Sequence, residues 1–191
     1  MKEGIHRRGQ LTRASALALV LVAAACGYPR TRTNLADRRA ADVRSAAVEV
    51  VDGSRHGLAG PRQGTLETLA RAAAHSPSPF VSAVTAFSVA AEAALRARGI
   101  RVEPKYDAAA VLRITLVEFE VHDEDAAGLS AFVSATYALL TPDRVPLWTV
   151  DQHRLPFRLA GLYLTDSQLA RMAEQSVDVG LASLPASHPH T

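Results

Sequence analysis

The chain is poor in reactive side chains and in long apolar runs. Cys26 is the only cysteine among 191 residues, so no disulfide within the chain can hold the fold. The apolar run from Ala14 to Ala25 is too short for a transmembrane helix, which needs about 20 apolar residues to cross the hydrocarbon core. The sequence therefore predicts a domain that depends on its own hydrophobic core.

Motifs that carry enzyme chemistry are also missing. The chain has no GxSxG nucleophile elbow, no P-loop and no dinucleotide-binding fingerprint. After the first few residues, Lys105 is the only lysine, whereas arginine and alanine are abundant. We attribute that bias to genomic base composition, and we expect neither catalytic activity nor a cofactor.

The first 25 residues are typical of an export signal. Basic residues at Lys2, Arg7, Arg8 and Arg13 precede the apolar run, which ends in small residues directly before Cys26. That ending resembles the lipobox of bacterial lipoproteins and implies acylation of Cys26, with the lipid chains holding the protein on a membrane. The alternative is an ordinary cleavage site that precedes a stray thiol. Gly27 follows the cysteine, where lipoproteins held at the inner membrane have aspartate. In this respect the sequence resembles lipoproteins that are sent to the outer membrane.

Removal of the signal changes the charge balance. The mature chain would have 191 − 25 = 166 residues, with 21 − 4 = 17 basic and 19 − 1 = 18 acidic side chains. The net charge of about −1 gives no reason to expect nucleic-acid binding. A chain of this length suits a single domain, which we place at residues 45–185.

Three segments lie outside the expected core of that domain. Residues 26–44 contain the lipidated cysteine and a segment rich in arginine, which we interpret as a solvated tether, or alternatively as a basic strip on anionic lipid head groups. Residues 53–79 form an irregular insertion rich in Gly, Pro and Ser, with a short helix expected over residues 65–74. Residues 186–191 are expected to form a flexible tail.

Hydrophobic periodicity predicts two helices in the domain. The first has an apolar stripe of Phe80, Val84, Phe87, Ala91 and Leu95, and Gly99 supplies its left-handed end. The second begins at Thr165 with a capping-box pattern and has a stripe of Leu169, Ala173, Val177, Leu181 and Leu184. Gly180 interrupts the second helix, which suggests a close approach to the sheet.

Strands are expected at 46–51, 100–103, 111–121, 129–140 and 145–159. In the third of these, the apolar residues change parity near Leu116, which indicates either a bulge or a strand covered on both faces. Pro146 and Pro156 restrict the last strand to edges or bulges. We expect an α+β fold in which two amphipathic helices pack on one face of a mostly antiparallel sheet of about four strands.

Histidine and tryptophan provide the remaining candidate site residues. His122 precedes the acidic residues Asp123, Glu124 and Asp125, but a solvated turn explains this cluster better than a metal site. His153 beside Asp151 is expected to be a surface pair, and His188 and His190 lie in the tail. Trp148, the only tryptophan, is expected to pack in the sheet, with an interface anchor as the alternative.

The order of these elements resembles the lipopolysaccharide-assembly lipoprotein family LptE. The similar features are the lipidated cysteine with the two residues after it, the end of the first helix, two strand starts and the end of the last helix: 26–28, 95–99, 107–112, 145–148 and 182–185. The resemblance implies a non-catalytic outer-membrane lipoprotein that helps an LptD-like β-barrel to assemble and that contacts lipopolysaccharide.

Two other functions fit an anchored domain of this build. One is an auxiliary lipoprotein of an ABC-type lipid transporter, which shares the anchor and a similar arrangement of helices and sheet. The other is a periplasmic lipoprotein that binds and activates an envelope enzyme. A periplasm-facing, lipid-anchored location is common to all three, and the partner protein distinguishes them.

Overall fold

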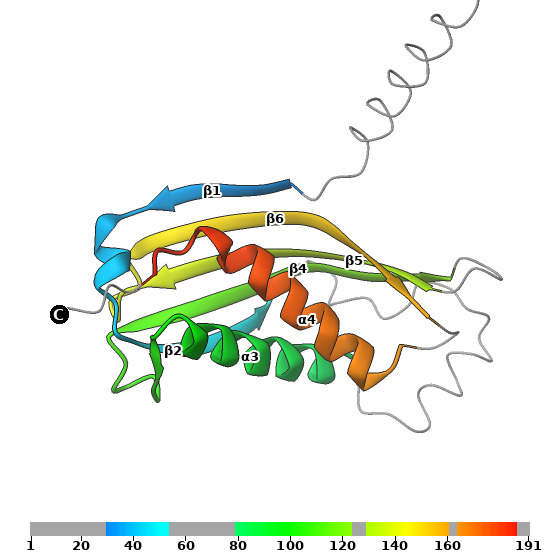
Figure 1. Ribbon diagram of the computed structural model, residues 1–191, viewed down its shortest axis with the longest axis horizontal. Coiled ribbons are helices and arrows are strands. Elements are labelled where there is room, and N and C mark those ends of the chain that lie inside the picture. The colour runs from blue at the N-terminus through cyan, green and yellow to red at the C-terminus, as the bar shows by residue number, and fades with distance from the viewer. Residues whose placement is uncertain (1–29, 54–78, 124–128, 161–163, 187–191) are drawn as a thin grey trace, which may run out of the picture.

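One mixed sheet carries two helices on one of its faces (Figure 1). The computed structural model describes residues 30–53, 79–123, 129–160 and 164–186. The strands are β1 (Arg30–Ala36), β2 (Ser45–Asp52), β3 (Arg101–Val102), β4 (Ala110–Asp123), β5 (Leu129–Leu140) and β6 (Pro146–Leu159). The helices are α3 (Pro79–Ala97) and α4 (Asp166–Gly180), and the short 3-10 helices are η1 (Arg38–Asp42) and η3 (Leu181–Ser183).

The strand order is β1-β6-β5-β4-β2-β3, and both kinds of strand pairing occur in it. The neighbouring pairs from β1 to β4 are antiparallel, whereas β2 is parallel to both β4 and β3. Parallel neighbours need a crossover connection, and α3 lies in the chain between β2 and its two parallel partners.

The expected sheet of about four mostly antiparallel strands is therefore wrong, although the fold is α+β. The sheet has six strands and is mixed. One additional strand is β1, in a segment where the sequence analysis expected a solvated tether. Its polar side chains lack the apolar alternation of a half-buried strand, because β1 is an edge strand that pairs only with β6. η1 then leads from β1 to β2.

Most of the two predicted stripes is buried, although Val84 is only half-buried and Leu181 and Leu184 lie just beyond the end of α4. Phe87, Ala91 and Leu95 of α3 are fully buried, and so are Ala173 and Val177 of α4. These side chains belong to one core together with the strand residues that face the helices. The side chain of Phe80 lies outside the described part of the structure. Neither described helix combines the length and apolarity that a membrane crossing requires.

The predicted ends of the helices are confirmed. Thr165 accepts a hydrogen bond from the backbone N–H of Gln168, whose side chain accepts one from the Thr165 N–H, so a complete capping box begins α4. Gly99 follows α3 with a φ of 76°, the left-handed conformation that glycine adopts without strain. Trp148 is fully buried in the sheet and its indole N–H donates to Ser183 Oγ at 3.3 Å.

Several predicted features lie outside the described residues. These are the export signal, Cys26, the short helix at 65–74, the acidic residues Glu124 and Asp125, and the tail histidines.

Candidate functional site: the open face of the sheet

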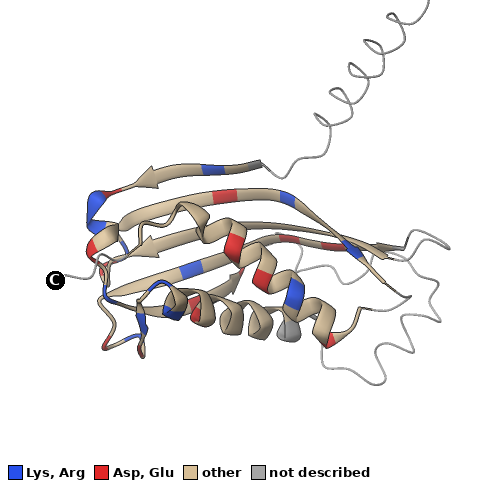
Figure 2. Ribbon diagram, viewed as in Figure 1, with Lys and Arg blue, Asp and Glu red and all other residues tan. Residues whose placement is uncertain are grey.

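The two faces of the sheet differ in chemistry. The face toward the helices is apolar, and the described helices leave the opposite face, called the open face below, uncovered (Figure 1). Charged side chains lie on several of the long strands (Figure 2). Those of the open face are half-buried between neighbouring strands and form three clusters. The surfaces free to contact a partner are this face, the sheet edges, the described loops and the outer sides of the two helices.

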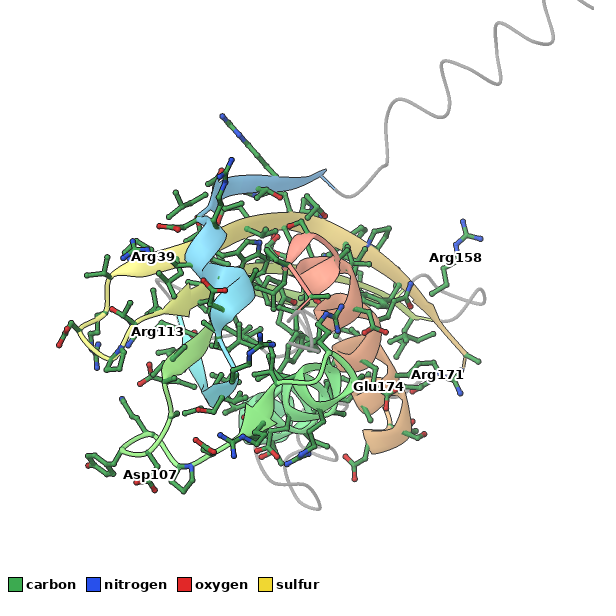
Figure 3. The ribbon with its side chains drawn as sticks, turned by 60° about the vertical axis from the view of Figure 1, so that its left-hand side comes forward. Arg39, Asp107, Arg113, Arg158, Arg171 and Glu174 are labelled. Carbon is green, nitrogen blue, oxygen red and sulfur yellow. The ribbon has the colours of Figure 1, made fainter. Side chains whose placement is uncertain are left out.

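The first cluster joins β2, β4 and the β3–β4 loop. Glu49 accepts a hydrogen bond from Arg113 Nε at 2.8 Å and one from Lys105 Nζ at 3.1 Å. Glu49 and Arg113 are register partners on parallel strands, so their side chains emerge side by side, and Figure 3 labels Arg113. Partial burial raises the pKa of Glu49, but the hydrogen bonds from Arg113 and Lys105 outweigh it, and the pKa is lowered.

The second cluster ties the edge strand to the sheet. Asp151 of β6 accepts from Thr136 Oγ1 of β5 at 2.8 Å and from Asn34 Nδ2 of β1 at 2.6 Å. Asn34 is the extra residue at a register shift between Thr33 and Leu35. The bulge therefore turns a polar side chain toward Asp151 and makes β1 a poor template for another strand.

The third cluster surrounds Arg154 of β6, whose φ is 47°. Its guanidinium donates to Glu118 Oε1 at 2.8 Å and lies 3.6 Å from Glu120 Oε2. The same group lies over the Phe132 ring, with 4.5 Å between Cζ and the ring centroid. His122 contacts this ring edge-on and lies 3.1 Å from Glu120. A left-handed backbone is costly for arginine, and such outliers persist only where surrounding contacts hold them.

Ser134 of β5 joins the backbone of this cluster to its charges. Its hydroxyl accepts the backbone N–H of Arg154 at 2.9 Å and donates to Glu118 Oε2 at 2.7 Å. The side chain is buried, and it satisfies a backbone group that the strand ladder leaves unpaired.

A fourth polar group lies in the core, between the sheet and α4. Tyr137 and Ser176 hydroxyls are 2.9 Å apart, and Ser176 donates to Gln152 Oε1 at 3.0 Å. Burial raises the pKa of the Tyr137 phenol far above its usual range, and the hydrogen bond with Ser176 only partly opposes this. Within the described chain, Gln152 Nε2 has no hydrogen-bond partner. Ser176 contacts a phenol and an amide, and neither group is a base that would activate its hydroxyl as a nucleophile.

The candidate histidines of the sequence analysis have different surroundings in the structure. His122 pairs with Glu120 rather than with a set of metal ligands, and no group of three or more such ligands gathers in the described residues. His153 is exposed on β6, while Asp151 beside it bonds to Asn34 and Thr136.

Sequence reasoning missed the Arg154 cluster. One signal for it was present: the inward-facing residues of β6 change parity between Gln152 and Leu155, just as those of β4 do near Leu116. The polar character of Gln152 concealed this change, because a glutamine is not counted among core residues when the apolar pattern is read.

Comparison with known proteins identifies the fold. No protein-family model matches the chain, and no curated protein matches it. Among solved structures it is similar to the PelC dodecamer from Paraburkholderia phytofirmans, with 17% identity, a TM-score of 0.50, and coverage of 85% of this chain and 100% of that one.

A minor lipoprotein from Acinetobacter baumannii is also similar, with 15% identity, a TM-score of 0.37, and coverage of 77% of this chain and 98% of that one. The structural neighbours thus include a bacterial lipoprotein. At these identities the likeness to PelC establishes the fold alone.

Proposed function

We propose that this protein is a lipid-anchored envelope protein that acts by binding and without catalysis. The observation that carries the proposal is that the apolar stripes of both helices are buried in the core. We therefore expect a partner to bind at the open face, the sheet edges or the loops. The charges of the open face are largely satisfied within the domain, which suits a protein surface better than a substrate pocket.

The start of β1 fits an anchor at Cys26. The cysteine precedes Arg30, the first residue of β1, by four positions, so covalent reach limits their separation to about 14 Å. Arg30 pairs with His153, near the middle of β6, and β1 runs from there toward the Pro146 end of β6 (Figure 1). Acylation of Cys26 would therefore hold the start of β1 close to the membrane surface.

The partner that we propose is an outer-membrane β-barrel of the lipopolysaccharide-transport type. The order of elements after Cys26, which resembles the LptE family, supports this choice. A barrel would contact the open face or a sheet edge, and the protein would aid barrel assembly and delivery of lipopolysaccharide. The outer membrane would be its location.

Self-association is a second candidate, favoured by the fold likeness to PelC, whose solved structure is a dodecamer. Twelve copies of an anchored domain would form a membrane-bound assembly. In this case the occupant of the open face or edges would be another copy of this chain, and no barrel would be required.

The test combines depletion with crosslinking in the native host. A photo-crosslinking residue at Thr149, which is half-buried on the open face, should capture the barrel, and depletion should lower the amount of mature barrel. A Cys26→Ser variant should leave the membrane fraction or persist as a precursor. Crosslinks only between copies would support self-association, and capture of an inner-membrane transporter with unchanged barrel levels would overturn the barrel proposal.

A further inference from the structure

The two outer sides of the sheet are protected to different degrees. β1 and β2 lie on opposite sides of the sheet (Figure 1). β1 has a bulge at Asn34 and arginines at positions 30 and 32, features that keep an edge strand from pairing with another chain. β2 contains no proline, lysine or arginine, and its register with β4 runs without a shift from Ala46 to Asp52. β2 therefore lacks the features that protect β1.

β3 covers only the first part of the outer edge of β2, the edge that faces away from β4. The pairing with β3 ends at Ala46, whose carbonyl accepts the N–H of Glu103 at 3.2 Å. Backbone groups of successive residues point to alternate sides of a strand, so those of Val48 and Val50 point outward as those of Ala46 do. In the described part of the chain, no strand pairs with these two valines on that side.

The side chains of the same valines show that the edge is open. Val48 and Val50 are the register partners of Leu112 and Ile114 of β4 and face the helices beside them. Leu112 and Ile114 are fully buried, whereas the two valines are only half-buried. Apolar side chains beside outward-pointing backbone groups form a template for one more strand, because an extended chain supplies donors and acceptors along the whole edge.

We propose that the outer edge of β2 pairs with the same edge of a second copy of this chain, antiparallel about a two-fold axis at Val50. In this register, the two Val50 residues exchange a pair of backbone hydrogen bonds. Glu49 lies opposite Val51 of the other copy, and Val48 lies opposite Asp52. Like charges therefore do not face each other across the pair, which would be destabilising.

The length and charge of the edge favour a second copy as its occupant. A pairing centred on Val50 uses residues 48–52 of each copy, which lie between the part covered by β3 and the end of β2. The carboxylate of Glu49 already accepts hydrogen bonds from two basic side chains of the same chain. The pairing therefore does not bury this charge without a partner.

The proposal specifies a surface for self-association, the second candidate function above, on which it rests. The β-barrel partner has no part in it, because the open face and β1 stay free. So short a pairing makes a small interface, and we expect a weak dimer whose proportion rises with protein concentration.

Sedimentation of the full-length protein in detergent tests the pairing. Val50→Pro removes the outward N–H and leaves the ladder with β4 intact, because proline is tolerated where the N–H points away from the sheet. We expect the dissociation constant of the dimer to rise about tenfold, since both exchanged hydrogen bonds are lost. Val50→Thr is the matched control, because it keeps the N–H and the branched shape and should dimerise as the wild-type protein does. Circular dichroism verifies that both variants are folded.

Oxidative crosslinking reads the register directly and does not depend on the proline variant. In the proposed pairing, the Cα atoms of the two Val50 residues are about 5.5 Å apart, within the range that a disulfide spans. Val50→Cys should therefore form disulfide-linked dimers. Val117→Cys, at a side chain of β4 that is 47% exposed, should not.

The outcomes separate this pairing from self-association in general. A wild-type protein that stays monomeric at all concentrations would overturn both. Dimers or larger assemblies that persist in Val50→Pro, together with no crosslink at Val50→Cys, would overturn the β2 pairing alone and would assign self-association to another surface.

Discussion

At the scale of single residues, Gly180 determines how closely α4 approaches the sheet. Its backbone has φ −61° and ψ −43°, which any residue adopts in a helix. The requirement for glycine is steric, since a methyl group at this position would overlap the ring of Tyr137. The close approach in turn allows the Tyr137 hydroxyl to reach Ser176.

We expect Gly180→Ala to destabilise the protein by about 1–2 kcal/mol. The overlap costs about 1–3 kcal/mol, and the better helix propensity of alanine returns at most about 1 kcal/mol. Urea unfolding followed by circular dichroism measures the change. Glu174→Ala, on the exposed side of the same helix, should change the free energy of unfolding by less than about 0.5 kcal/mol. A more stable Gly180→Ala variant would show that the close approach is not required.

The buried Tyr137 phenol makes stability depend on alkaline pH. Its pKa is raised by burial above the ordinary value of 10.0, so between pH 10 and 11 the unfolded chain loses this proton while the folded protein keeps it. The unfolded state then binds fewer protons, and stability falls as pH rises, by up to about 1.4 kcal/mol per pH unit.

We therefore expect Tyr137→Phe to remove part of the alkaline loss of stability, at a cost of about 1 kcal/mol at neutral pH for the lost hydrogen bond. Urea midpoints measured from pH 8 to 11 give both values. Tyr106→Phe is the control, because the Tyr106 side chain is 99% exposed and meets the same solvent in both states. An unchanged alkaline slope in Tyr137→Phe would contradict the prediction.

At the scale of elements, α3 and α4 contribute most of the covering layer of the core. Leu95 and Leu181 are both fully buried. Truncation of either to alanine should cost about 2–5 kcal/mol, because the packed surroundings relax only partly into the space. The measurement is again urea unfolding, and Val89→Ala, at a side chain of α3 that is 64% exposed, should have little effect. A small loss at Leu95 would contradict the assigned core.

Sequence patterns predicted these helices because their apolar stripes are regular and their ends carry recognisable caps. The bulge near Leu116 was also predictable, since the parity change is visible in residues that are all apolar. β1 was not predictable in this way: its residues are polar and exposed, and its pairing depends on β6, more than 100 positions along the chain. The parallel pairing of β2 with β4 also depends on tertiary contacts that local patterns do not encode.

The residues of the candidate site also divide into those that local sequence predicts and those that depend on tertiary contacts. Cys26 could be proposed from local sequence alone, whereas the Arg154 cluster required two bulges to coincide on neighbouring strands. Each of its charged residues looks like an ordinary solvent-facing group in the sequence. Only the register of three strands brings Glu118, Ser134 and Arg154 together.

At the scale of the whole molecule, the position of β1 distinguishes the two ends of the sheet. β1 begins beside His153, five positions before Arg158, and runs away from Arg158, which extends away from the domain (Figure 3). The β5–β6 turn, with Asp143, lies at the opposite end. Residues 146 and 158 of β6 are twelve steps apart, which corresponds to about 40 Å along the strand.

An anchor at Cys26 therefore predicts an orientation that can be measured, with Arg158 nearer the membrane than Asp143. In membrane-bound protein, a fluorophore attached at Arg158→Cys should be quenched by a lipid head-group quencher, whereas one at Asp143→Cys should be much less affected. An acylated Cys26 retains no free thiol, so the introduced cysteine is the only one that takes the label. Similar quenching at both positions would contradict this orientation. Labelling of Cys26 itself in the wild-type protein would contradict the anchor on which that orientation depends.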